Sequence, residues 1–173
     1  MHSILNKEEI KKLILEKNLI ENYINLDKQL TSNGFDLTIE KIFEFTSLGK
    51  LDFSNKEREI SQTEEITPIK KNPEDKYGWW RLKKGTYKIR TNEIINLPSN
   101  YVALCFSRTS LLRMGSYTLH GVWDAGFRGK GEFILMVENK FGLEIKENAR
   151  IAQLIFFKIN PTESYKGIYK DLK

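Results

Sequence analysis

The chain has 173 residues, of which 40% are hydrophobic, and its formal net charge is +5. A chain of this length can bury one hydrophobic core, so we expect a single domain over residues 1–173. No stretch approaches the ~18 consecutive apolar residues of a membrane span, and the N-terminus lacks the apolar segment of a signal peptide. We therefore expect a cytoplasmic protein without membrane contact. The lysines are scattered rather than gathered beside aromatic residues, which argues against a dedicated nucleic-acid surface.

Cysteine and histidine are rare in this sequence. The chain holds one cysteine, Cys105, and two histidines, His2 and His120. These are too few ligands for a tetrahedral zinc site, which excludes the zinc-dependent base deaminases with their His/Cys/Cys ligands. Metal-assisted chemistry would need carboxylates or substrate phosphates, and this indicates magnesium, which binds oxygen ligands and usually keeps several waters.

The predicted elements begin with one short amphipathic helix near the N-terminus. Asn6 can cap it, Glu9 follows three residues later, and Ile10 and Ile14 recur at helical spacing. Later segments alternate as strands do and are separated by Gly, Pro and Asn. These segments are residues 35–39, 86–90, 101–106, 133–137 and 151–159. The pattern predicts an all-β sandwich or barrel.

A strongly polar stretch interrupts the strand pattern between about residues 46 and 78. We interpret it as a surface excursion that contains a strand or two. Trp79 and Trp80 follow it directly, and they are expected to anchor its return to the core rather than to bind a base. The chain ends in a lysine-rich tail, about residues 161–173, that is either functional or frayed.

Residues 121–129 read Gly-Val-Trp-Asp-Ala-Gly-Phe-Arg-Gly, which places Asp124 among apolar neighbours. An aspartate enclosed by such neighbours is costly to bury without a partner or a task, and perturbed carboxylates cluster at functional sites. Asp-Ala-Gly is equally a hairpin turn signal. The segment alone leaves both a catalytic base and an ordinary turn open.

Residues 107–115 bring hydroxyl and guanidinium groups together after the strand at 101–106. Arginine offers paired donors to phosphate oxygens, and Ser and Thr add further hydrogen bonds, so the cluster can form an anion cradle. The alternative is a solvated strand end whose hydroxyls cap a turn or a short helix.

Separate stretches of the chain resemble, in the same order, the motifs of the dUTPase and dCTP deaminase superfamily. The stretches are Ser32 to Leu37, Ser107 to Gly115, Gly121 to Gly131, Ala149 to Leu154 and Tyr165 to Tyr169. The resemblance is closest to the archaeal-type dUTPases, whose third motif also continues through Arg-Gly-Lys/Arg-Gly. It implies a distorted jelly-roll-like β-barrel and a homotrimer with shared active sites. It also implies hydrolysis of dUTP to dUMP and pyrophosphate with Mg²⁺, which is held mainly through substrate phosphates and water.

The resemblance assigns roles around the reacting phosphate. Asp124 corresponds to the aspartate that activates the attacking water and meets the sugar 3′-hydroxyl. Arg108, Thr109 and Ser110 correspond to the motif that grips the triphosphate, with Thr109 where serine is usual. Phe127 stands where an aromatic residue, commonly tyrosine, packs against the deoxyribose and excludes a 2′-hydroxyl.

The remaining expected residues support the nucleotide from other stretches. Gln153 can donate to a phosphate oxygen or a metal-bound water, or can be a structural amide satisfied by the backbone. Arg113 is expected near phosphate or a neighbouring subunit. Asp36 is expected to orient Arg108 or the hydrated magnesium, or to be purely structural. Gly121 leaves room for the base to approach the backbone.

Three further positions are candidates for contact with the nucleotide. His120 lies close to Asp124 in sequence, but the family usually reads the base with main-chain groups, so its role stays open. In the tail, Tyr165 and Tyr169 resemble the shorter ending of the deaminase-like branch, where an aromatic residue covers the nucleotide.

The choice between hydrolase and deaminase depends on one glutamate. Zinc-independent dCTP deaminases carry it ten residues after the third-motif aspartate, where this chain has Ile134, or Met136 if the second glycine is aligned. Neither can transfer a proton. Glu132 and Glu138 are displaced by an even number of residues and so share the strand face. Hydrolysis is favoured, while a deaminase, a bifunctional enzyme and a non-catalytic nucleotide-binding regulator stay open.

Overall fold

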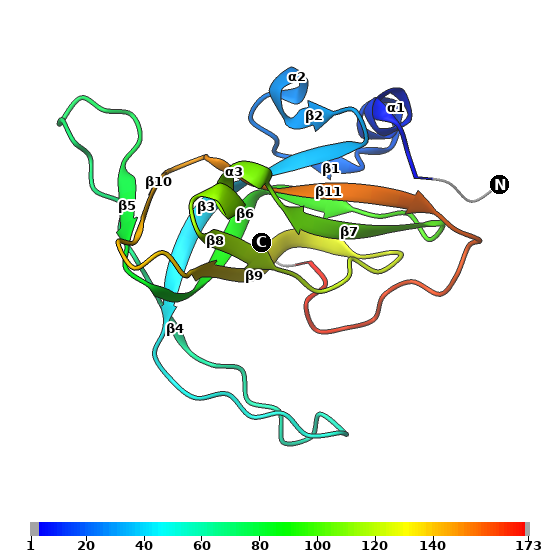
Figure 1. Cartoon of the computed structure of the whole chain (residues 1–173). Helices are drawn as coiled ribbons and strands as arrows, with labels where there is room; N and C mark the ends of the chain where they lie inside the picture. Colours follow the sequence, from blue (N-terminus) through cyan, green and yellow to red (C-terminus); the bar gives the residue numbers. More distant parts are fainter. Residues whose placement is uncertain (1–3, 172–173) are drawn as a thin grey trace.

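The computed structural model describes residues 4–171 and is dominated by one nine-stranded sheet (Figure 1). Its main path runs β7-β11-β3-β6-β9-β8, and β1, β2 and β4 pair at its sides. The bounds are β1 Ile20–Glu21, β2 Leu30–Thr31, β3 Gly34–Phe45, β4 Thr63–Glu65, β6 Gly85–Asn96, β7 Tyr101–Ser107, β8 Ser116–Leu119, β9 Arg128–Val137 and β11 Arg150–Lys158. The five predicted strand segments lie in these strands, except that Ile159 falls just after the end of β11.

The sheet curls into a nearly closed barrel, as the fold prediction requires. Its two end strands meet through a side chain, because Ser107 of β7 accepts a hydrogen bond from the Thr118 amide of β8 at 2.8 Å. Beyond β8, Trp123 and Ala103 exchange backbone hydrogen bonds of 3.0 and 3.1 Å. These contacts occupy polar groups that an open sheet edge would expose. The prediction of an all-β barrel is confirmed.

The core follows the period-two burial expected of strands with one face inward. Along β6, alternate residues from Tyr87 to Ile95 are buried. Phe35 and Phe156 are completely buried on β3 and β11. Truncating one such aromatic residue to alanine typically costs about 3–5 kcal/mol, so this apolar face supplies much of the stability of the fold.

The predicted N-terminal helix is α1, Lys7–Lys17. Asn6 and Glu9 form a capping box in which each side chain bonds the other's backbone amide, and Ile10 and Ile14 face the core. The other helices, α2 Leu26–Gln29 and α3 Thr109–Arg113, are single short turns. Within residues 4–171, no helix is long and apolar enough to cross a membrane.

The polar excursion forms an arm that projects from the barrel and a second loop that returns to it (Figure 1). Backbone bonds between Lys50 and Glu59 hold the arm together. The returning strand β5, Trp79–Leu82, pairs with β10, Leu143–Lys146, in a separate two-stranded sheet. Trp80 is buried, and its indole N–H donates to the Ile66 carbonyl at 2.7 Å. The prediction that this tryptophan pair anchors the excursion is therefore confirmed for Trp80.

The tail runs from β11 back across the segment between β8 and β9. The Thr162 amide donates to the Ser99 carbonyl at 3.0 Å, and the Tyr165 amide donates to the Ala125 carbonyl at 2.8 Å. The Tyr165 ring packs edge-on against Phe127, with ring centroids 5.7 Å apart. The described part of the tail therefore covers the hairpin that carries Asp124.

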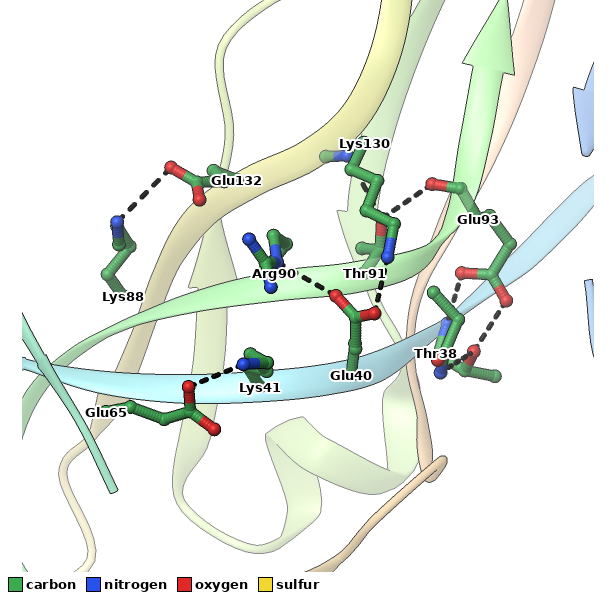
Figure 2. A network of polar contacts seen from close by, with 12 residues as sticks. Thr38, Glu40, Lys41, Glu65, Lys88, Arg90, Thr91, Glu93, Lys130 and Glu132 are labelled. Carbon is green, nitrogen blue, oxygen red and sulfur yellow. Dashed lines mark hydrogen bonds and ion pairs between the residues drawn. The ribbon is translucent and has the colours of Figure 1, made fainter. Parts of the chain in front are cut away.

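Glu93 on β6 is a buried carboxyl group that the sequence analysis did not single out. It accepts a hydrogen bond from the Thr38 backbone amide at 2.9 Å (Figure 2). It also accepts one from the Gln29 side-chain amide at 2.7 Å. Burial raises the pKa of Glu93, and these hydrogen bonds oppose the rise. Because Gln29 also donates to the Asp36 carbonyl at 2.9 Å, this network braces the start of β3.

Candidate active site

A polar pocket of about 290 Å³ lies where β7 ends and α3 begins. Strand ends and loops that are distant in sequence contribute to its wall. The pocket is lined by Thr31, Asp36, Ser107, Arg108, Thr109, Ser110, Arg150 and Gln153. It brings together Asp36, Arg108, Thr109, Ser110 and Gln153, all of which were predicted as site residues.

The centre of this pocket is one carboxylate shared by two arginines. Asp36 is buried on β3, and its Oδ2 lies 3.0 Å from Arg108 Nε and 3.2 Å from Arg150 Nη1. Burial raises the pKa of Asp36, and the two guanidinium groups oppose this shift. Two cations facing one anion leave the pocket positive, which suits a polyanionic ligand.

Gln153 stands directly opposite Asp36 in the register of β11 and β3. Its amide N–H₂ donates to the Thr31 hydroxyl at 2.8 Å and approaches Asp36 Oδ1 at 3.5 Å. Thr31 and Arg150 were not predicted as site residues. Arg150 lies in the stretch Ala149 to Leu154, which resembles a motif of the family. Its positive charge, three residues before Gln153, was the signal that could have identified it as a site residue.

The hydroxyls after β7 do not serve as a helix cap. Arg108 is the N-cap residue of α3 and makes no side-chain capping hydrogen bond, while Thr109 and Ser110 occupy the first turn. The capping alternative is therefore wrong at the N-cap position. Arg113, at the other end of α3, is exposed and does not line the polar pocket.

A second, larger pocket of about 370 Å³ is mostly apolar. It lies beside β9, the segment before it, the tail and the base of the arm. Its lining comprises Phe45, Ile60, Lys88, Gly121, Val122, Trp123, Phe127, Lys130, Gly131, Glu132, Phe133, Ile134, Tyr165 and Tyr169. Four residues predicted to touch the nucleotide, Gly121, Phe127, Tyr165 and Tyr169, meet here. Such a lining suits a flat, largely apolar ligand with a few polar groups.

The expectation that Asp124 is enclosed by apolar neighbours is wrong for this chain. The hairpin alternates as a strand does, so Trp123 and Ala125 are buried while Val122 and Asp124 face outward. Asp124 is exposed and lines neither of the two pockets. An exposed carboxylate can meet a water or a ligand, but its apolar sequence neighbours do not desolvate it.

His120 packs behind the apolar pocket rather than lining it. Its ring lies 4.3 Å from Phe133 and 6.1 Å from Trp123 by centroids. Its Nε2 is buried and has no hydrogen-bond partner among residues 4–171, and burial lowers the pKa of His120 to about 4. A neutral ring in this position packs as an aromatic residue does.

The displaced glutamates differ in position. Glu132 lines the apolar pocket together with Ile134, two residues later on β9, as expected for one strand face. Glu138 lies beyond the end of β9, pairs with Lys84 at 2.8 Å and is not part of the lining. Only the first of these glutamates is therefore placed to meet a ligand in the pocket.

The two pockets are separate within one chain. Trp123, next to Asp124, pairs with Ala103 of β7, and Arg108 lies five residues further along the chain, directly after the end of β7. Five residues correspond to about 16 Å at the rise of a strand. Among the side chains of residues 4–171, no group of three or more His, Cys, Asp and Glu residues could hold a metal ion. One chain therefore presents a positive, polar pocket and a mostly apolar pocket at two separate places.

Comparisons with known proteins identify the family of this chain. The dCTP deaminase-like family model matches residues 4–159. A probable deoxyuridine 5′-triphosphate nucleotidohydrolase of Archaeoglobus fulgidus is 36% identical over 169 residues, which cover 97% of this chain and 96% of that protein. A deoxyuridine 5′-triphosphate nucleotidohydrolase of Methanocaldococcus jannaschii is 34% identical over 161 residues, covering 91% and 99%.

A solved structure shares the fold at low identity. The 2′-deoxycytidine 5′-triphosphate deaminase from Agrobacterium tumefaciens matches with a TM-score of 0.65 and 14% identity. The match covers 91% of this chain and 48% of that one, so the chain spans about half the length of that protein. From the family match and these full-length relatives, the chain belongs to the dCTP deaminase-like family.

Proposed function

We propose that this chain is a dUTP diphosphatase that hydrolyses dUTP to dUMP and pyrophosphate. Relatives of similar length at 34–36% identity carry the name of that activity. The observation that carries the proposal is the pairing of a positive, hydroxyl-rich pocket with an apolar, aromatic one. A deoxynucleoside triphosphate combines a negatively charged triphosphate, which matches the first pocket, with a largely apolar nucleoside, which matches the second.

The polar pocket binds the triphosphate in this proposal. Arg108 and Arg150 supply guanidinium donors, and Thr109 and Ser110 supply hydroxyls. Asp36 fixes both guanidinium groups before substrate arrives, so little reorganisation is needed as negative charge develops. In the reaction these groups stabilise the pyrophosphate that departs.

The apolar pocket holds the deoxyribose and the base. Phe127, buried against Tyr165, presents a ring to the sugar where a 2′-hydroxyl would collide. A Cβ built on Gly121 meets no atom within 4 Å, so this position is open on its ligand side. Tyr165 and Tyr169 bring the tail onto the same ligand.

Asp124 acts as the general base. Its carboxylate accepts a proton from water as the water oxygen bonds to the α-phosphorus. The bond from that phosphorus to the α–β bridging oxygen breaks, and its electron pair leaves with pyrophosphate. The exposed position of Asp124 lets it face a substrate that spans two subunits.

Magnesium is part of the proposal, held through the substrate. Asp36 is the carboxylate in the lining of the polar pocket, and it is already paired with two arginines. Because this carboxylate is occupied, the cation would be bound by phosphate oxygens and water rather than by the protein. Such a cation neutralises phosphate charge. Gln153 is placed beside Asp36 to donate to a phosphate oxygen or to a water of that cation.

The proposed assembly is a homotrimer with sites between subunits. Asp124 and Arg108 lie in different parts of one chain, so a neighbouring copy can bring its polar pocket to the apolar pocket of the first. The exposed Arg113 and the exposed apolar side chains Phe106, Leu112 and Met114 lie near the polar pocket, on β7 and around α3. Apolar side chains exposed on one chain are typical of an interface between copies.

The first test is incubation of purified protein with magnesium and either dUTP or dCTP, followed by chromatography of the nucleotides. The expected products are dUMP and pyrophosphate, from dUTP alone. Formation of dUTP or dUMP from dCTP would assign deamination, for which Glu132 in the apolar pocket is the candidate proton carrier. No product from either nucleotide would contradict enzymatic activity and favour a nucleotide-binding regulator.

A further inference from the structure

Charged side chains form a series of ion pairs across the face of β3, β6 and β9 (Figure 2). Lys130 and Arg90 share Glu40, at 2.5 and 2.8 Å. The Lys88–Glu132 pair differs because both of its members line the apolar pocket, whereas Glu40 lies outside that lining. Charged groups inside a largely apolar wall are costly unless a ligand or a partner uses them.

The Lys88–Glu132 pair is loose enough to accept a further partner. Lys88 Nζ lies 3.3 Å from Glu132 Oε2, and the two side chains are 25% and 27% exposed. By comparison, Lys130 is 12% exposed and bonds Glu40 at 2.5 Å. An ammonium group has three N–H donors, and a carboxylate accepts several hydrogen bonds. Both members line the pocket and keep capacity for a further hydrogen bond, while Lys88 Nζ also lies 4.6 Å from the centroid of the Phe43 ring.

The strand register sets the order in which a bound nucleoside would meet this pair. Lys88 is aligned with Ile134, two residues beyond Glu132, and Phe127 precedes the start of β9. Phe127, Glu132 and Lys88 line the same pocket, and with the sugar at Phe127 the base meets Glu132 before Lys88, whose register partner is Ile134. In a pyrimidine, C4 is the ring atom opposite the sugar-bearing N1, and N3 lies nearer to the sugar.

We propose that the Lys88–Glu132 pair selects uracil over cytosine, with Glu132 accepting the N3–H and Lys88 donating to O4. This inference rests on the proposed function. Uracil presents a donor at N3 and an acceptor at the 4-position, which match the two side chains. Cytosine presents an acceptor at N3 and an amino donor at the 4-position, so it opposes both. A desolvated polar mismatch of this kind disfavours the wrong base.

The test is equilibrium binding of the non-hydrolysable imido analogues of dUTP and dCTP to wild-type protein and variants. Wild-type protein is expected to prefer the dUTP analogue. Lys88→Met and Glu132→Gln are each expected to reduce that preference roughly tenfold. The double swap, Lys88→Glu with Glu132→Lys, exchanges donor and acceptor and is expected to move the preference toward the dCTP analogue.

Lys41→Met is the matched control, because Lys41 pairs with Glu65 at 2.6 Å on the same face (Figure 2) but lies outside the pocket lining. It is expected to leave the preference unchanged. Thermal unfolding checks each variant, and the single variants decide the question if the double swap does not fold. An unaltered preference in folded Lys88→Met and Glu132→Gln overturns the inference. Wild-type protein that binds neither analogue rejects the proposed function itself.

Discussion

The two pockets of this chain contrast in how they are built. Sheet strands supply the centre of the polar pocket, since Asp36 and Gln153 lie on adjacent strands and Arg108 follows a third. Loops supply much of the apolar pocket, which depends on the hairpin, the tail and the base of the arm. The comparison teaches that the barrel itself sets the centre of the polar pocket, whereas the apolar pocket is completed by less regular segments that pack on β9.

Asp124→Asn is expected to have the largest effect, because it should abolish most dUTP hydrolysis while leaving nucleotide binding intact. An amide keeps the shape of the carboxylate but cannot accept the proton of the attacking water, so kcat should fall about 10²- to 10⁴-fold. Affinity for the imido analogue of dUTP should be nearly unchanged, as should thermal unfolding, because Asp124 is exposed. Single-turnover hydrolysis measures the effect. Wild-type turnover in this variant would remove Asp124 from the role of base.

Mixed assemblies test whether the two halves belong to different subunits. Arg108→Gln alone should raise the KM for dUTP about 10- to 100-fold, because a charged phosphate contact is lost. Co-expression of Asp124→Asn and Arg108→Gln chains with different tags should yield assemblies in which about a quarter of the sites carry both intact residues. Activity near that fraction, measured at dUTP concentrations far below the KM of the Arg108→Gln chain, supports shared sites. Mixed assemblies no more active than the parents would place both residues in one subunit's site.

Deletion of residues 165–173 tests the apolar pocket, much of which is built from loops. The tail packs on the hairpin through the Tyr165 amide and the Phe127 ring, so its loss should open the apolar pocket and raise the KM several-fold. Tyr165→Phe keeps the ring and its packing and serves as the control. Steady-state kinetics with dUTP measure both. Unchanged kinetics after truncation would show that the tail contributes nothing to substrate binding.

The sequence was informative where local patterns determine structure. The capping box at Asn6 and Glu9 and the strands at 101–106 and 151–159 could be predicted, because capping and period-two burial are local properties. The exposure of Asp124 could not be predicted, because apolar neighbours do not tell which strand face a residue occupies.

Long-range partners set a second limit on sequence reasoning. The burial of Glu93 depends on Gln29 and Thr38, which lie 64 and 55 residues away. The role of Arg150 depends on its distance from Asp36, which is set by the pairing of β11 with β3. Resemblance to a family located Asp36, Arg108 and Gln153, while the contacts among them required the fold.

His120→Phe addresses the aromatic wall behind the nucleoside half and should have the smallest effect. Burial lowers the pKa of His120 to about 4 from the ordinary 6.5, so the unfolded chain takes up a proton between these values and the folded chain does not. The stability that the neutral His120 ring contributes to the wild-type fold is therefore fully present above pH 6.5 and is lost as the pH falls toward 4.

Phenylalanine keeps the contacts with Phe133 and Trp123 and removes a buried nitrogen that has no hydrogen-bond partner. The variant should be at least as stable as wild type at pH 8, and its advantage should grow by on the order of 1 kcal/mol near pH 4.5. The growth is kept small because partial exposure of the ring screens the shift. Urea unfolding at the two pH values measures this difference. Equal pH dependence of the two proteins would mean that His120 titrates normally in the folded chain. Its ring would then have access to water, and a role toward the base would again have to be considered.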